Sequence, residues 1–171
     1  MTGEGAGRAD AGVAVPLDAA LLLDNQLCFL VARLHRALND RYRPVLGALG
    51  LTYPQYLVML ALWEQAPMSV GRLGERLRLD SGTLSPLLKR LEAAGLVTRT
   101  RSAGDERSVE VGLTDAGRAL RAEAGDIPSW VGSCIAGSLD EFVRVRGELT
   151  EILDRVENAP PPPVALPGLV R

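Results

Sequence analysis

The sequence predicts a mainly α-helical fold with a small β-hairpin, and three observations support this prediction. Apolar residues recur at helical spacing over most of 17–158. Across about 96–113 the period changes to alternation of apolar and polar residues. The chain has 171 residues, 47% hydrophobic and 23% charged, which suits one compact domain with tails and excludes disorder throughout.

The ends of the chain differ in composition from its middle. Residues 1–16 are rich in Gly and Ala without periodicity, so we expect a disordered N-terminal tail. Residues 159–171 contain four consecutive prolines, which favour polyproline II and end a preceding helix. We therefore expect a structured domain at 17–158 and a Pro-rich C-terminal tail at 159–171.

Cysteine content, apolar runs and charge indicate the compartment. Two cysteines are too few for a disulfide-stapled secreted scaffold, and the chain does not open on a charged-then-apolar leader. The longest apolar run is far below the roughly 18 residues of a membrane span. We therefore expect a cytoplasmic protein without a membrane partner. The net charge of −2 gives no indication of nucleic acid for the whole chain.

The first part of the domain predicts two helices. Leucine and valine recur at spacings of three, four and seven over 18–38, which predicts one long helix with Cys28 in its middle. A short second helix follows over about 41–49. It ends at Gly50, a residue type favoured just after a helix C-terminus.

A helix-turn-helix is expected next. Thr52 with Gln55 three residues later is a capping-box pattern, which starts a helix that ends before Pro67. Ser69 is a suitable cap for a short helix over 70–78. After a tight turn comes a helix over 81–94. Its apolar stripe consists of Leu84, Leu87, Leu88 and Leu91.

Strand signals and further helices complete the domain. The alternating segments 96–101 and 109–113 flank a polar turn at 102–107, which predicts a two-stranded hairpin. Thr114 is then expected to cap a helix. The remaining helices are expected at 115–124, 129–136 and 139–156.

This order of elements indicates a winged helix-turn-helix. We place a DNA-binding lobe at about 52–121, with dimerisation helices at about 17–50 and 126–158. Across 69–121 there are ten basic and seven acidic residues, a modest local excess of positive charge. The flanking helices exceed what one small lobe needs to cover it. We therefore expect a homodimer on a pseudo-palindromic operator in double-stranded DNA.

The helix over 81–94 is the candidate recognition helix, because its apolar stripe is used for packing and its polar residues face outward. Hydroxyls near its start and basic residues further along suit phosphates and base edges. In the wing, Asp105 is expected to orient Arg107 toward a narrow minor groove, the alternative being a surface ion pair. The predicted DNA-binding residues are Ser81, Thr83, Ser85, Lys89, Arg90, Arg99, Arg101, Asp105 and Arg107.

The residue types alone leave the roles of the cysteines and tyrosines open. A free cysteine is often a small buried hydrophobe, and Cys28 and Cys134 both fit that interpretation. Tyr42 and Tyr53 fit interface aromatics. His35 is the only histidine, and the sequence has no metal-ligand set, phosphate loop or carboxylate pair. We therefore expect no metal, no cofactor and no enzymatic activity.

Several segments resemble the MarR family of repressors and, within it, the two-cysteine (OhrR-type) members that sense organic hydroperoxides. The resemblance spans about 23–156. Its winged-helix motifs are typical of the whole family, whereas the cysteine and tyrosine motifs are specific to the peroxide sensors. The segments are LGERL (73–77), LDSGTLSPLLKRLE (79–92), DER (105–107), DNQLCF (24–29) and LTYPQYLVML (51–60).

The resemblance implies a repressor that senses organic hydroperoxides through cysteine oxidation. Cys28 matches the peroxidatic cysteine of the family. Tyr42 and Tyr53 match the two tyrosines whose hydroxyls reach that sulfur across the dimer interface and stabilise its thiolate. Cys134 lies where two-cysteine members have their resolving cysteine, so a disulfide with Cys28 is expected to release the operator. Ala32 stands where some members have a further tyrosine.

Two other functions fit parts of the sequence. One is a MarR-type repressor released by non-covalent binding of a phenolic or drug-like ligand, with Cys28 not redox-active. The other is a thiol peroxidase, although the Arg and the Thr-x-x-Cys turn that such enzymes carry are missing. Operator binding before and after treatment with organic hydroperoxide, with and without Cys28, separates these functions.

Overall fold

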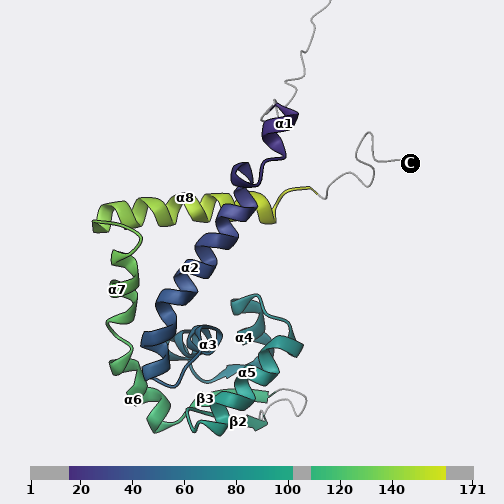
Figure 1. Cartoon of the computed structure of the whole chain (residues 1–171). Coiled ribbons are helices and arrows are strands. Elements are labelled where there is room, and N and C mark those ends of the chain that lie inside the picture. Colours follow the sequence, from purple (N-terminus) through teal and green to yellow (C-terminus); the bar gives the residue numbers. More distant parts are fainter. Residues whose placement is uncertain (1–15, 102–108, 161–171) are drawn as a thin grey trace, which may run out of the picture.

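A computed structural model describes residues 16–101 and 109–160 (Figure 1). Helices dominate and three short strands form one sheet, so the predicted fold class is confirmed. The elements in order are α1 (Leu17–Ala20), the 3-10 helix η1 (Leu23–Asn25), α2 (Leu27–Ala48), α3 (Tyr53–Glu64), β1 (Met68–Ser69), α4 (Val70–Leu77), α5 (Ser81–Ala93), β2 (Val97–Arg101), β3 (Val109–Leu113), α6 (Asp115–Glu123), α7 (Ile127–Ser133) and α8 (Leu139–Glu157).

The helices α3 to α6 and the sheet form a lobe, and α2, α7 and α8 extend from it. In Figure 1, α2 and α7 lead away from the lobe, and α8 runs across the far end. The helix α2 contacts α3 and α7, whereas α8 has no buried residue. One ion pair ties α8 back to the lobe, from Arg78 Nη2 to Glu157 Oε2 at 3.3 Å.

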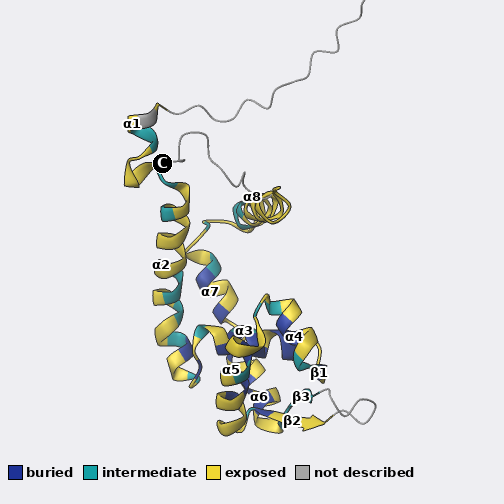
Figure 2. Ribbon diagram, turned by 90° about the vertical axis from the view of Figure 1, so that its right-hand side faces the viewer, coloured by how far each residue is buried: buried dark blue, intermediate teal, exposed yellow. Residues whose placement is uncertain are grey.

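The hydrophobic core lies mainly inside the lobe and includes Leu46 of α2 and Ile127 and Val131 of α7 (Figure 2). The helix α3 runs through its centre and buries side chains around most of its circumference, including Tyr56, Met59 and Leu62. The whole predicted stripe of α5 is buried against this helix and α4, which confirms its period. Among the described residues no single helix is long and apolar enough to span a membrane; α2 and α3 pass that test only as a pair bent by 70°.

The predicted helix over 18–38 is wrong at its N-terminal end. The chain leaves α1 after Ala20, forms the short turn η1 and starts α2 at Leu27. Side-chain amides take over the carbonyls that end α1: Asn25 Nδ2 donates to Ala19 O at 2.8 Å, and Gln26 Nε2 donates to Ala20 O. Cys28 therefore lies in the first turn of α2 and not in the middle of a helix.

The predicted separate helix over 41–49 is instead the last part of α2. Pro44 lies inside the helix and removes one backbone donor, yet α2 continues to Ala48. The helix ends where expected, because Gly50 adopts a left-handed conformation with φ of 68° and Leu51 N–H then bonds to Leu46 O at 2.9 Å.

The predicted hairpin is part of a larger sheet. The strands β2 and β3 pair antiparallel with Arg99 opposite Val111, as the alternation predicts. A two-residue strand, β1, adds to the other edge of β3, which gives the order β1-β3-β2. Sequence alternation cannot reveal a strand of two residues, so only the fold discloses it.

The predicted helix caps hold the helix-turn-helix together. Gln55 Oε1 accepts from Thr52 N–H at 2.8 Å, and Ser69 Oγ accepts from Arg72 N–H at 3.2 Å. The turn between α4 and α5 has Arg78 in a left-handed conformation. It ends at Asp80, whose carboxylate caps α5 by accepting from Thr83 N–H at 2.9 Å.

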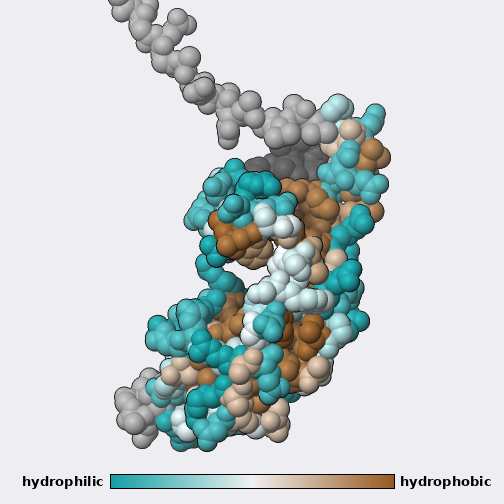
Figure 3. Space-filling model, turned by 90° about the vertical axis from the view of Figure 1, so that its left-hand side faces the viewer, coloured by the Kyte–Doolittle hydropathy of each residue, from teal (hydrophilic) through white to brown (hydrophobic). Residues whose placement is uncertain are grey.

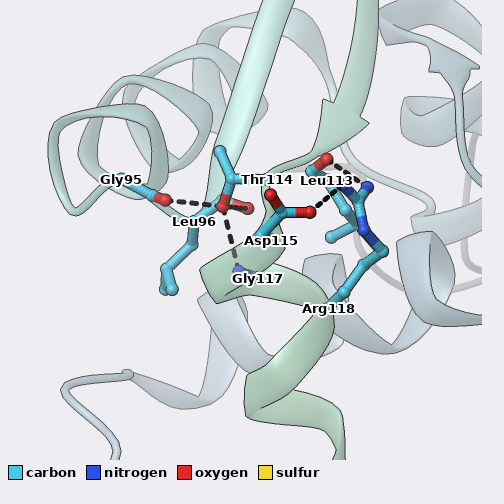
Figure 4. Close-up of polar contacts among 7 residues, drawn as sticks. All are labelled: Gly95, Leu96, Leu113, Thr114, Asp115, Gly117 and Arg118. Atoms are coloured by element: carbon cyan, nitrogen blue, oxygen red, sulfur yellow. Dashed lines mark hydrogen bonds and ion pairs between the residues drawn. The ribbon is translucent and has the colours of Figure 1, made fainter.

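The start of α6 fixes the base of the wing (Figure 4). Thr114 Oγ1 donates to Gly95 O at 2.6 Å and accepts from Gly117 N–H at 2.9 Å. Arg118 donates to Leu113 O and to Asp115 Oδ1, both at 2.6 Å. The predicted cap at Thr114 is confirmed, and it also joins the end of β3 to the segment that leads into β2.

Candidate nucleic-acid interface and redox site

The outward face of α5 carries the predicted recognition residues. Ser81, Thr83, Lys89 and Arg90 are exposed, and Ser85 is half-buried. Neither Lys89 nor Arg90 forms an ion pair with any other described residue. Their positive charges are therefore available to a polyanion, at least as far as the described residues go.

Asp80, the N-cap of α5, accepts hydrogen bonds from both the backbone N–H and the hydroxyl of Thr83. Thr83 Oγ1 donates to Asp80 Oδ2 at 2.9 Å. Hydrogen bonds from the Thr83 backbone and then its hydroxyl lower the pKa of Asp80, so this carboxylate stays charged at the helix N-terminus. The Thr83 hydroxyl therefore has a structural partner, while Ser81 next to the cap is exposed.

The wing residues differ in their surroundings. Arg101 is exposed, whereas Arg99 is half-buried and its Nη1 lies 3.8 Å from Glu92 Oε2 on α5. Arg99 therefore braces the wing against α5, and its predicted contact with DNA stays a prediction. Asp105 and Arg107 lie outside the described residues, and so does their predicted role.

The three tyrosines of the chain form one aromatic cluster where α2 meets α3. The rings of Tyr42 and Tyr53 are 4.7 Å apart between centroids, and those of Tyr42 and Tyr56 are 6.0 Å apart. Sequence reasoning paired Tyr42 with Tyr53 but missed Tyr56, which is buried beneath them. Because Tyr53 and Tyr56 are three residues apart on a helix, their side chains are neighbours on one face, and this spacing could have predicted the third member of the cluster.

Burial keeps these phenols protonated. Desolvation raises the pKa of Tyr42 to about 12, with smaller contributions from neighbouring Tyr53 and Tyr56. Desolvation also raises the pKa of Tyr53 and Tyr56. All three hydroxyls are therefore hydrogen-bond donors over the whole physiological pH range.

The tyrosine cluster predicts a loss of stability in alkali. The unfolded chain releases the Tyr42 proton near pH 10, whereas the folded chain holds it to about pH 12. The folded state thus binds more protons in this window, and stability falls as pH rises through it. We expect Tyr42 to account for about 1–2 kcal/mol of this loss after allowance for solvent screening.

Denaturant titrations of the parent and Tyr42→Phe at about pH 9 and pH 11.5 measure this loss. The variant should lose less stability between the two values than the parent. Because no tyrosine lies outside the cluster, tyrosinate absorbance reports the cluster directly. Equal alkaline losses in parent and variant contradict the assignment.

Cys28 lies on an apolar surface that none of the described residues covers. Its thiol is free and exposed. The side chains of Leu27, Leu30 and Val31 around it are 64%, 58% and 53% exposed. None of the described residues hydrogen-bonds to its sulfur.

Cys28 and Tyr42 are both on α2 but far apart. Fourteen residues separate them, which at 1.5 Å per residue is about 21 Å along the helix axis. Tyr53 packs on Tyr42, so it lies at the same remote end of α2. Within one chain, therefore, these tyrosines do not contact the Cys28 sulfur.

Cys134 has a different environment at the C-terminal end of α7. It is also a free, exposed thiol. Its Sγ donates to Trp130 O, one helical turn back, at 3.6 Å. The Cys134 sulfur therefore has a hydrogen-bond partner in the last turn of α7.

The helix α8 carries a second set of exposed apolar side chains. Figure 3 shows hydrophobic surface in the upper half of the molecule as well as over the lobe. Exposed apolar area of this extent marks an interaction surface. We call it the apolar face; besides Leu27, Leu30 and Val31 its exposed residues are Leu21, Leu22, Leu23, Leu34, Leu139, Val143, Leu149, Ile152, Leu153 and Val156.

The fold and the exposed basic recognition helix define a regulator of the winged helix-turn-helix class. The family model described as MarR family matches residues 51–109. The organic hydroperoxide resistance transcriptional regulator of Bacillus subtilis is 45% identical over 136 residues, which cover 80% of this chain and 92% of that protein. The chain belongs to the MarR family of transcriptional regulators.

Solved structures agree with this assignment. Reduced AbfR bound to DNA superposes with a TM-score of 0.71 at 35% identity, covering 79% of this chain and 92% of that one. Disulfide-formed AbfR superposes with a TM-score of 0.58 at 39% identity, covering 78% and 91%. AbfR is a protein of Staphylococcus epidermidis.

Proposed function

We propose that this protein is a homodimeric DNA-binding repressor that releases its operator when an organic hydroperoxide oxidises Cys28. One observation carries the proposal: an exposed thiol sits in an apolar face that no described residue covers, about 21 Å along α2 from a pair of half-buried phenols. A second copy of the chain satisfies both features at once. It covers the apolar face and brings its own tyrosines to the sulfur.

The length of the apolar face supports a two-fold dimer. It runs along the N-terminal half of α2 and the whole of α8, two helices that bury almost nothing in their own chain. Isologous pairing of such a face is the commonest arrangement of a homodimer. In that arrangement the lobes lie at the outer ends, where two copies of α5 fit successive major grooves of a pseudo-palindromic operator.

Exposed groups on α5 supply the DNA contacts in this proposal. Lys89 and Arg90 neutralise phosphates, while Ser81 and Ser85 near the start of the helix reach base edges. Arg101 on β2 extends the positive surface onto the wing. Reduced AbfR, which is described as bound to DNA, supports this use of the lobe.

The basic residues predict a definite salt dependence of operator binding. Arg90→Ala is expected to weaken binding and to reduce the slope of log affinity against log salt by about one per subunit, because one phosphate contact is lost. Fluorescence anisotropy at several salt concentrations measures this slope. Arg144→Ala on α8, remote from the lobe, is the matched control and should leave the slope unchanged. An unchanged slope for Arg90→Ala removes this residue from the interface.

The proposed sensing chemistry starts from the Cys28 thiolate. The sulfur attacks the terminal oxygen of the hydroperoxide, the O–O bond breaks, and the alkoxide takes a proton to leave as an alcohol. Cys28 becomes a sulfenic acid. The Cys134 thiol then displaces its hydroxyl, so that a disulfide and one water molecule form. A small-molecule or protein thiol must later reduce the disulfide.

The dimer supplies what this reaction needs. Tyr42 and Tyr53 of the second copy donate hydrogen bonds that stabilise the attacking thiolate, and their raised pKa keeps them donors. Leucines around Cys28 offer contacts to an alkyl chain, which hydrogen peroxide lacks. Cys134, a free and exposed thiol, is available for the resolving step. Disulfide-formed AbfR supports this sequence of events.

The test combines operator titration with non-reducing electrophoresis. We expect cumene hydroperoxide to release the operator and to produce a reducible Cys28–Cys134 crosslink, identified by peptide mapping. Cys134→Ser should lose this crosslink, and its oxidation should stop at the Cys28 sulfenic acid. The variant then has no Cys28–Cys134 disulfide for an added thiol to reduce. Release by a phenolic ligand, with no response to hydroperoxide, overturns the redox proposal in favour of a ligand-controlled repressor.

A further inference from the structure

The break between α1 and α2 occurs where the sequence contains no helix breaker. Neither Gly nor Pro occurs over 17–38, and apolar residues keep their helical spacing throughout. An uninterrupted helix satisfies every internal backbone group, so the break needs other donors for the carbonyls that it frees. Side chains at the break provide them.

Two neighbouring amides supply these donors. In a continuous helix the carbonyls of Ala19, Ala20 and Leu22 accept from backbone N–H groups four residues later. Here Asn25 Nδ2 donates to Ala19 O at 2.8 Å, while Gln26 Nε2 donates to Ala20 O and, at 3.2 Å, to Leu22 O. Two backbone bonds add to them, from Leu22 N–H to Ala19 O at 3.3 Å and from Asn25 N–H to Leu22 O at 3.1 Å. Among the described residues, Ala20 O has the Gln26 side chain as its donor.

Gln26 also begins the next helix. Its backbone carbonyl accepts from Phe29 N–H at 3.0 Å and from Leu30 N–H at 3.1 Å, so α2 starts directly after it. Cys28 is then the second residue of α2. The N–H groups of Leu27 and Cys28 have no acceptor within α2, and this first turn carries the positive end of the helix dipole.

The two cysteines of the chain show what the break changes for a sulfur atom. Cys134 lies at the C-terminal end of α7, and its Sγ donates to the carbonyl of Trp130 one turn back. In a continuous helix Cys28 has the same option, with the carbonyl of Asp24 one turn back. At the start of α2 that acceptor is not part of the helix, and no described residue takes its place.

We propose that Asn25 and Gln26 are positioning residues for Cys28: their amides end α1 and so place the reactive sulfur in the first turn of α2. The inference deepens the proposed function and rests on it, because it assigns these two residues to the sensing reaction. They touch neither the hydroperoxide nor the sulfur. Their effect is indirect: because they end α1, Cys28 lies at the N-terminal end of α2 and not in the middle of a longer helix.

The test compares the pH dependence of Cys28 alkylation in Cys134→Ser protein with and without the amides. Gln26→Met keeps the side-chain length and removes the donor, and Asn25→Ala favours helix. In the double variant we expect α1 and α2 to merge. The pH of half-maximal alkylation should rise by about half a unit to one unit, and alkylation at neutral pH should slow about three- to tenfold.

The control removes an amide that lies elsewhere on the same helix. Asn39 Nδ2 is 2.9 Å from His35 Nε2, and Asn39→Ala should leave the alkylation profile unchanged. Circular dichroism checks that each variant is folded and should show added helix in the double variant. If the double variant does not fold, Gln26→Met and Asn25→Ala are measured singly, and each should give part of the shift.

The outcomes separate this inference from the function on which it rests. A folded variant with the parental alkylation profile overturns the positioning role. Alkylation involves neither DNA nor hydroperoxide, so its profile is informative even if the parent ignores hydroperoxide. In that case the proposed function fails while the placement of the sulfur by Asn25 and Gln26 stands as measured.

Discussion

Replacing Cys28 by serine is expected to abolish hydroperoxide-dependent release of the operator. A serine hydroxyl stays protonated at neutral pH and does not attack the O–O bond, so the oxidation never starts. Cys28 is exposed in the chain, so the isosteric change should leave the fold and operator affinity within about twofold of the parent. In the parent, oxidation should weaken operator binding by about 5- to 150-fold, the usual size of such coupling.

Operator titration with stoichiometric hydroperoxide measures this difference. The parent and Cys28→Ser are compared before and after oxidation, and Cys134→Ser serves as a cysteine control that keeps the attacking sulfur. Mass spectrometry should find oxygen added at Cys28 in that control and none on the serine variant. Release from Cys28→Ser at the parental hydroperoxide dose assigns sensing to another group.

Substituting alanine for Gly117 is expected to cause the largest loss of stability. A Cβ atom here overlaps the backbone carbonyl oxygen of Leu96 and lies 3.0 Å from its carbon. Backbone on both sides cannot yield as a flexible side chain does, so α6 must shift away from the base of the wing (Figure 4). That shift disturbs two hydrogen bonds, from Gly117 N–H to Thr114 and from Trp63 Nε1 to Gly117 O at 2.8 Å. We expect a loss of about 3 kcal/mol or more.

Gly71→Ala provides a matched control, because it makes the same chemical change in a helix with free space. No atom lies within 4 Å of the added Cβ in α4. Alanine is the better helix former, so this variant should gain about 0.5–1 kcal/mol. Denaturant unfolding compares the two variants with the parent. Similar stabilities for Gly117→Ala and Gly71→Ala contradict the close approach of α6 to Leu96.

The periodic and capped segments of this protein are readable from its sequence. The stripe of α5, the capping box at Thr52 and the cap at Thr114 are each decided by residues within one or two turns. The resemblance to MarR proteins rests on such local motifs, and the family assignment confirms it. The roles of Cys28, Cys134, Tyr42 and Tyr53 in sensing stay predictions that the experiments above test.

Other features depend on contacts that spacing does not reveal. The break before α2 arises from two side-chain amides that reach back six residues, from Asn25 to Ala19 and from Gln26 to Ala20. Arg99, which the sequence predicts to contact DNA, points toward Glu92 because of the pleat of β2. In both cases a polar side chain bonds to another residue of the same chain, and hydrophobic periodicity does not predict which residue that is.

By itself, then, the sequence determined the helices of the lobe and the pairing segments of β2 and β3, because hydrophobic period and end caps are local properties. It also determined the family. Only the tertiary structure decided that Cys28 lies in the first turn of a helix and that Tyr56 completes the aromatic cluster. It also decided that no other described residue covers α8 and half of α2. These outcomes depend on contacts between residues that are not neighbours in the sequence. Burial and hydrogen bonding set the free energy of those contacts, and local spacing does not encode either of them.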